Sequence, residues 1–112
     1  MSAIDRFRSY LVDHPGDRFA LYSLAFALVK AGRSEEALGV FGELLAAHPT
    51  SGAGHYQLGL LHSAAGRLTE AQTAWQAGLD ALAGESGPDA RKSRVEIQAA
   101  LDQVEDQLDD LD

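Results

Sequence analysis

The residues that come nearest to a chemical site in this sequence are two histidines, His55 and His62. They are seven positions apart, so in a helix over residues 52–65 they would lie on one face. A metal site needs a third ligand, and no Asp or Glu occurs on that helix. Ser63, next to His62, has no acid partner for nucleophilic catalysis. We therefore interpret both histidines as packing residues and predict no catalytic residue, no metal site and no cofactor.

Composition excludes other classes of site. The chain of 112 residues has no cysteine, which rules out disulfides and thiolate ligands. Its formal net charge is −8, and six of its acids lie in residues 102–112, where there is no base. Without a basic face, nucleic acid is not an expected partner. The longest apolar run, residues 19–29, is about half a membrane span, and the N-terminus lacks a signal-peptide pattern. We expect a cytoplasmic protein without membrane contact.

One predicted helix, over residues 17–31, is apolar on two faces. The first face is formed by Leu21, Leu24, Ala25 and Leu28. The second is a stripe at i, i+3, i+7 and i+10, formed by Phe19, Tyr22, Phe26 and Val29. A helix that is apolar on both faces needs a cover for the extra face. That cover is a partner peptide, a second copy of the chain, or the chain's own C-terminal helix.

Periodicity and helix-end signals predict six helices in all. They are expected at residues 2–14, 17–31, 35–47, 52–65, 68–82 and 88–110. Gly32 is expected to end the second helix in a left-handed conformation, Ser34 to cap the third, and Pro88 to lie in the first turn of the sixth. The sixth helix carries an apolar seam of 4-3-4-3 spacing, formed by Ile97, Leu101, Val104, Leu108 and Leu111.

These helices repeat at an offset of 34 residues. The offset places Tyr22 on Tyr56, Ala31-Gly32-Arg33 on Ala65-Gly66-Arg67, Phe41 on Trp75 and, one unit earlier, Ala37 on Ala3 and Phe41 on Phe7. The repeat resembles the tetratricopeptide repeat family. One unit supplies the family positions Leu21, Leu24-Ala25, Leu28, Gly32, Ala37, Phe41 and Pro49; the next supplies His55, Leu58-Gly59, His62, Gly66, Ala71 and Trp75. His55 and His62 replace bulkier residues, and Ala83 replaces the closing proline.

The resemblance implies an all-α fold, a right-handed α-solenoid of antiparallel helix hairpins. We expect one domain, 1–112, made of a half-repeat helix (2–14), two repeats (17–49 and 51–83), a capping helix (88–110) and an acidic end (111–112). Small residues are expected where helices approach most closely, at Gly59, Ala25, Ala37 and Ala71.

The resemblance also implies a function, namely a non-enzymatic protein-interaction module that binds a peptide or helix in its concave groove. The groove positions are Phe19, Tyr22, Phe26, Val29, Lys30, Tyr56, Leu60 and Ser63. They lack the Lys–Asn–Arg clamp that some family members use for a C-terminal carboxylate, so an apolar or aromatic-anchored ligand is expected. One alternative is a homo-oligomeric subunit, a homodimer for example, that associates through the groove and the C-terminal helix. Another is a histidine-based metal protein or small enzyme.

Overall fold

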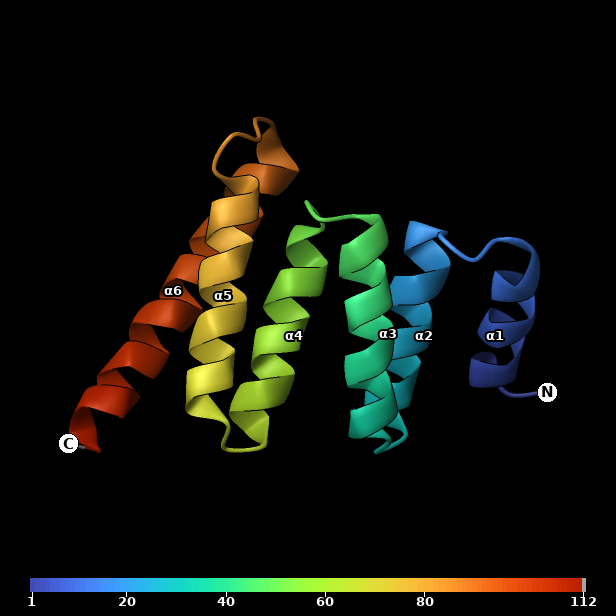
Figure 1. Cartoon of the computed structure of the whole chain (residues 1–112), viewed down its shortest axis with the longest axis horizontal. Coiled ribbons are helices and arrows are strands. Elements are labelled where there is room, and N and C mark those ends of the chain that lie inside the picture. The colour runs from blue at the N-terminus through green and yellow to red at the C-terminus, as the bar shows by residue number, and fades with distance from the viewer. Residues whose placement is uncertain (112) are drawn as a thin grey trace. The chain divides into compact units, whose positions relative to one another are not determined.

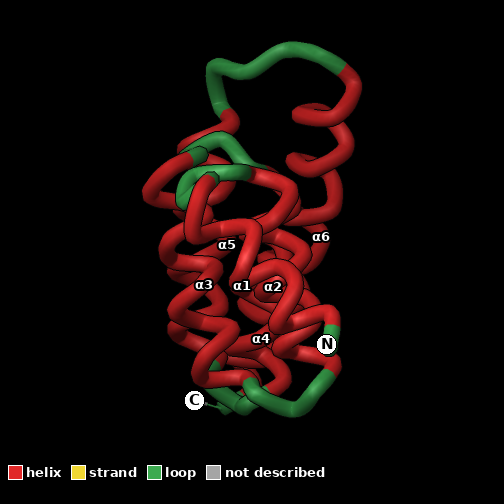
Figure 2. The backbone as a smooth tube through the Cα atoms, turned by 90° about the vertical axis from the view of Figure 1, so that its right-hand side faces the viewer, coloured by secondary structure: helices red, strands yellow, loops and turns green. Residues whose placement is uncertain are grey.

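The computed structural model describes residues 1–111, which form six α-helices and no β-strand (Figures 1 and 2). The helices are α1 (Ala3–Asp13), α2 (Arg18–Lys30), α3 (Ser34–Ala47), α4 (Gly52–Ala64), α5 (Leu68–Leu82) and α6 (Pro88–Asp110). The six helices expected from the sequence are therefore present. The predicted acidic end, residues 111–112, lies partly outside the described residues.

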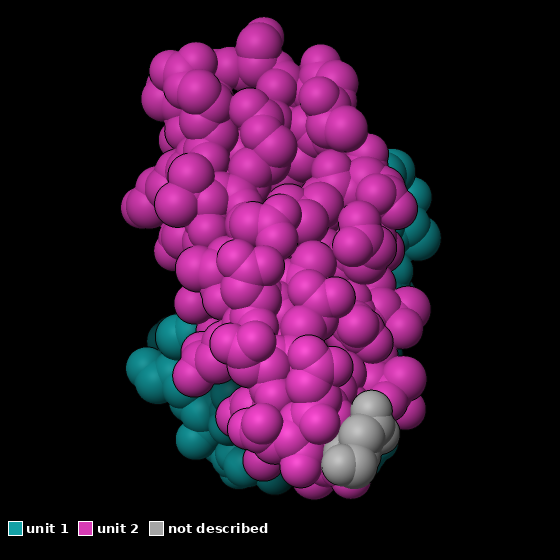
Figure 3. Space-filling model, turned by 90° about the vertical axis from the view of Figure 1, so that its left-hand side faces the viewer, with its two compact units in different colours: residues 1–49 teal, residues 50–112 magenta. Residues whose placement is uncertain are grey.

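The chain divides into two compact units, which Figure 3 distinguishes by colour. Unit 1 comprises residues 1–49; in it α2 packs against α3, and α1 packs against α2. Unit 2 comprises residues 50–112; in it α4 packs against α5, and α6 packs against both of them. The boundary between the units falls where one predicted repeat ends and the next begins.

Glycine ends the first helix of each hairpin. Gly32 and Gly66 have φ angles of 77° and 78°, in the left-handed region that only glycine adopts without strain. The N–H groups of Arg33 and Arg67 then donate to the carbonyls of Leu28 and His62, at 2.8 Å and 2.9 Å. These are Schellman motifs, which satisfy carbonyls at a helix end and reverse the chain within three residues. The prediction for Gly32 is confirmed.

Some helix starts have a side-chain cap and others do not. The side chains of Asp17 and Ser51 accept hydrogen bonds from backbone N–H groups in the first turns of α2 and α4. The prediction that Ser34 caps α3 is wrong: Arg33 holds that position, makes no side-chain capping bond, and Ser34 is the first helical residue. The Schellman motif accounts for the difference: Arg33 is its last residue, with its N–H bonded to the Leu28 carbonyl, and α3 begins at the next residue. Pro88 begins α6 as predicted.

Each unit has its own buried core. In unit 1 it comprises Ala20, Leu21, Leu24, Ala25 and Leu28 of α2 with Ala37, Val40, Phe41 and Leu44 of α3. In unit 2 a cluster joins Ala71, Trp75 and Leu82 of α5 to Ile97, Leu101 and Val104 of α6. The seam residues Ile97, Leu101 and Val104 of α6 are thus buried in the core of unit 2. Leu108 is half-buried and Leu111 is 73% exposed.

Candidate functional site

The outward face of α2 carries an ordered aromatic ladder. The rings of Tyr22 and Phe26, one helical turn apart, stack with centroids 6.2 Å apart and an interplanar angle of 11°. The Lys30 ammonium, a further turn along, lies 5.7 Å from the Phe26 ring centroid, within the range of a cation–π contact. Tyr22 also contacts the buried ring of Phe41 edge-on, at 6.4 Å. The ladder is therefore anchored in the core through Tyr22, while Phe26 is 41% exposed.

The four residues of the predicted stripe, Phe19, Tyr22, Phe26 and Val29, do not form one continuous surface in the structure. Phe19 is 75% exposed and makes no ring contact with the ladder among the described residues. It lines instead a cleft of about 400 Å³ between α1 and α2, together with Phe7 and Tyr10 of α1. Val29 is half-buried. Sequence spacing could not separate Phe19 from Phe26, because both lie on the same side of the helix and only the position of α1 distinguishes them.

The predicted positions on α4 line a cleft in unit 2. Tyr56, Leu60 and Ser63 are half-buried along an open cleft of about 450 Å³. Tyr56 and Leu60 also pack against the core cluster of this unit. The other wall comes mainly from α6, with Val95, Glu96, Ala99, Ala100, Gln103, Val104 and Gln107. Sequence reasoning placed Val104 in the apolar seam of this helix but assigned none of these α6 residues to the site. The small and polar residues among them gave no signal that could have found them.

The two histidines of α4 are in contact with α5 or with the turn that leads to it. His55 is 7% exposed, and its Cβ lies where a side chain on Gly78 of α5 would have to go. The Nδ1 of His62 accepts a hydrogen bond from the Nε of Arg67 at 3.0 Å, across the turn that joins α4 to α5. Within residues 1–111 no group of three or more His, Cys, Asp or Glu side chains could hold a metal ion.

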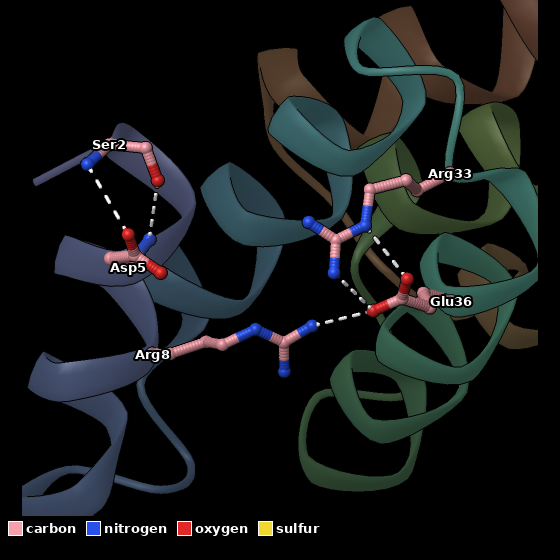
Figure 4. Close-up of polar contacts among 5 residues, drawn as sticks. All are labelled: Ser2, Asp5, Arg8, Arg33 and Glu36. Carbon is pink, nitrogen blue, oxygen red and sulfur yellow. Dashed lines mark hydrogen bonds and ion pairs between the residues drawn. The ribbon is translucent and has the colours of Figure 1, made fainter.

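A cluster of charges connects α1 to the start of α3 (Figure 4). The carboxylate of Glu36 accepts hydrogen bonds from Arg33 at 2.8 Å and 2.9 Å and from Arg8 at 2.9 Å. The Arg33 hydrogen bond holds the pKa of Glu36 below its ordinary value, and Glu36 in turn raises the pKa of Arg33. All three side chains are solvent-exposed, so the cluster orients α1 and adds little stability. Arg8 and Glu36 also line an open cleft of about 500 Å³ between α1 and α3.

None of the helices formed by the described residues has the length and apolar character needed to cross a membrane.

Comparison with known proteins gives a family match over part of the chain and several similar folds. Residues 19–51 match the model of the tetratricopeptide repeat, and no curated protein matches the chain. A tetratricopeptide repeat domain protein from Salinibacter ruber is 28% identical, with a TM-score of 0.70 over 80% of this chain and 97% of that one. The Yersinia enterocolitica type III secretion chaperone SycD, solved with a peptide of the translocator YopD, is 12% identical. Its TM-score is 0.81 over 93% of this chain and 78% of that one.

A third solved structure is the Sgt2 TPR domain from Aspergillus fumigatus. It is 21% identical, with a TM-score of 0.75 over 96% of this chain and 67% of that one. These similarities confirm the all-α, α-solenoid fold class predicted from the repeat. Residues 19–51 thus match a tetratricopeptide repeat, and the chain as a whole is similar to tetratricopeptide repeat domains of known structure.

Proposed function

We propose that this protein is a non-enzymatic interaction module that binds an apolar or aromatic-anchored peptide or helix. The main anchor is the aromatic ladder of Tyr22 and Phe26, with Lys30 at its end and Val29 beside it. A ligand side chain that covers Phe26 removes apolar surface from water, which is the principal source of affinity in such contacts. An acidic group next to that anchor would meet the Lys30 ammonium.

The observation that carries this proposal is the combination of exposure and order at Phe26. Its ring is 41% exposed yet held between the Tyr22 ring and the Lys30 ammonium, at 6.2 Å and 5.7 Å. A contact residue that is already fixed in position loses little conformational entropy on binding. Aromatic side chains, Phe included, are enriched at protein interfaces, and a few well-packed residues there carry most of the binding energy.

The cleft along α4 is a second contact region in the same proposal. Tyr56 and Leu60 supply apolar surface, and the hydroxyl of Ser63 with the amides of Gln103 and Gln107 supplies hydrogen-bonding groups for a peptide backbone. The half of the predicted site on α2 belongs to unit 1 and this half to unit 2, so each is proposed as a contact region in its own right.

The fold neighbours support the same class of function. SycD was solved in complex with a peptide of the translocator YopD. We propose that the present chain likewise acts through protein or peptide partners in the cytoplasm, as one functional domain over residues 1–112, and not as an enzyme. The burial of His55 and the Arg67–His62 hydrogen bond support a structural role for the two histidines.

A phage-displayed peptide library, selected on the immobilised protein, tests the proposal. We expect selected peptides to share an aromatic or large aliphatic anchor. The substitution Phe26→Ala should weaken their binding at least about tenfold, because it removes the exposed ring of the ladder. Tyr22 is a poorer choice for this test, since its ring supports Phe41 in the core and its removal would also destabilise the fold.

The matched control is Val12→Ala on α1. Val12 is 79% exposed and lies outside the ladder and the α4 cleft. We expect this variant to bind the selected peptides as the wild type does. Equal binding of the selected peptides by the wild type and by Phe26→Ala would disprove the assignment of the ladder as the main anchor.

A further inference from the structure

The first helix of the chain is less buried than its counterpart in the next repeat. The offset of 34 residues places Ala3, Phe7 and Tyr10 of α1 on Ala37, Phe41 and Leu44 of α3, each of which is 0% exposed. In α1, by contrast, no residue is buried, and Tyr10 is 47% exposed.

This difference leaves an aromatic cleft at the α1–α2 end of unit 1. Phe7 and Tyr10 of α1 and Phe19 and Ala20 of α2 line it, and its volume is about 400 Å³. Phe19 is 75% exposed, the highest exposure of any aromatic side chain among the large exposed apolar residues. Neighbouring large apolar side chains that stay exposed mark interaction surfaces.

Charges at the cleft are self-complementary. Arg6 lines the cleft, and its guanidinium makes no hydrogen bond or ion pair with any side chain of the described residues. Asp17 lines it as well, and uses Oδ2 to cap the Ala20 N–H at 2.8 Å, which leaves Oδ1 available. One surface therefore carries a cation, an acid and an aromatic centre.

A surface of this kind suits a two-fold interface. In an isologous dimer every contact between two different residues occurs twice, so Arg6 of one copy can contact Asp17 of the other, and Asp17 of the first can contact Arg6 of the second. The aromatic side chains of the two copies would then cover one another between the two ion pairs. We propose that the α1–α2 end of unit 1 is a homodimer interface, formed by Phe7, Tyr10 and Phe19 with Arg6 and Asp17. This interface is distinct from the ladder and does not depend on the function proposed above.

Sedimentation equilibrium of the full chain tests the dimer directly. The lining is small compared with the roughly 800 Å² per partner of a standard interface, so the dimer should be weak, with a dissociation constant of about 1–100 μM. We expect the average mass to rise from 11.9 kDa towards twice that value between about 1 μM and about 1 mM protein. A mass of one chain at every concentration would overturn the proposal.

Two serine substitutions locate the interface. Tyr10→Ser and Phe19→Ser should each raise the dissociation constant of the dimer at least about tenfold. The matched control is Val12→Ser, which lies on the same helix as Tyr10 and is 79% exposed, but lines a different surface with Leu11 and Val40. A dimer weakened equally by all three variants would place the contact elsewhere on α1 and overturn the assignment, and so would a dimer that none of them weakens.

Charge substitutions test the pairing of the two copies. Arg6→Glu places carboxylates opposite one another and should weaken the dimer at least about tenfold. Adding Asp17→Asn removes that repulsion and keeps a good capping residue at the start of α2, so the double variant should regain part of the lost affinity. No recovery in the double variant would argue against the Arg6–Asp17 contact.

The same variants separate this proposal from the function proposed above. Arg6 and Tyr10 lie outside the ladder, so Arg6→Glu and Tyr10→Ser should bind the selected peptides as the wild type does. If these two variants lose peptide binding while their average mass in sedimentation equilibrium equals that of the wild type, the cleft binds a peptide ligand and not a second copy. That outcome would overturn the dimer. Conversely, Phe26→Ala should leave the dissociation constant of the dimer unchanged.

Discussion

At the scale of single residues, the close approach of α4 and α5 depends on one glycine and one tryptophan. A Cβ placed on Gly59 would overlap the indole ring of Trp75. The indole Nε1 donates a hydrogen bond to the Tyr56 carbonyl at 3.1 Å, so the ring is held against the backbone of α4 at this point. Trp75 is 3% exposed as a result. The glycine is therefore required by packing, since its φ angle is not in the left-handed region.

Two glycine-to-alanine substitutions should have opposite effects on stability. Gly59→Ala should lower the free energy of unfolding by about 1–3 kcal/mol, because the indole ring has to move. Gly42→Ala, on the exposed side of α3 with nothing within 4 Å of the new Cβ, should raise it by about 0.5–1 kcal/mol. Urea unfolding followed by far-ultraviolet circular dichroism measures both changes. Shifts of the same sign in the two variants would contradict this account of Gly59.

At the scale of elements, α6 completes unit 2 by packing against α4 and α5 together. It begins after a loop of residues 83–87, where Gly87 has a φ of 111° and Pro88 starts the helix. Arg94, two turns into α6, reaches back to this loop. Its Nη1 donates to the carbonyl oxygens of Leu82 and Glu85, at 2.8 Å and 2.7 Å. One side chain thus ties the end of α5 and the loop to α6.

Replacing Arg94 should loosen this connection locally. In Arg94→Met two carbonyl groups lose a charged donor, and such hydrogen bonds contribute about 1.5–3 kcal/mol each. We expect amide hydrogen exchange in residues 83–92 to become at least about tenfold faster. Arg91→Met is the control, because Arg91 is exposed and its side chain makes no hydrogen bond with the described residues. Equal exchange rates in the two variants would show that Arg94 does not hold the loop.

At the scale of the whole molecule, the chain consists of two units with separate cores. The cluster of unit 2 draws its members from α5 and α6, and α4 adds Tyr56 and Leu60. This cluster contains Trp75, the only tryptophan of the protein. Tryptophan fluorescence therefore reports on unit 2, whereas circular dichroism reports on all six helices.

We predict that a fragment of residues 50–112 folds by itself. It keeps the complete cluster, although a domain of about 60 residues is only marginally stable. The fragment should give a helical circular dichroism spectrum and a cooperative thermal transition in Trp75 fluorescence. A fragment of residues 50–87, which lacks Ile97, Leu101 and Val104, should give neither. The prediction fails if the longer fragment is unfolded, or if the two fragments behave alike.

Much of this organisation was determined by the sequence alone, because its signals are local. A 3.6-residue periodicity, glycine after a helix and proline at a helix start act within one or two turns, and they predicted the six helices and the conformation of Gly32. The repeat at 34 residues predicted small residues where helices approach most closely, and Ala25, Ala37 and Ala71 are fully buried. Local signals are least reliable at the ends of helices, which is why Ser34 was misplaced by one position.

The tertiary structure alone decided how side chains from different helices combine. It separated Phe19, which faces the α1–α2 cleft, from Phe26, which stacks on Tyr22. It brought α6 beside α4, so that Gln103 and Gln107 share a cleft with Tyr56. The physical reason is common to these cases. Periodicity states which side of a helix a residue occupies, but the neighbour on that side comes from a distant part of the chain, and only packing specifies it.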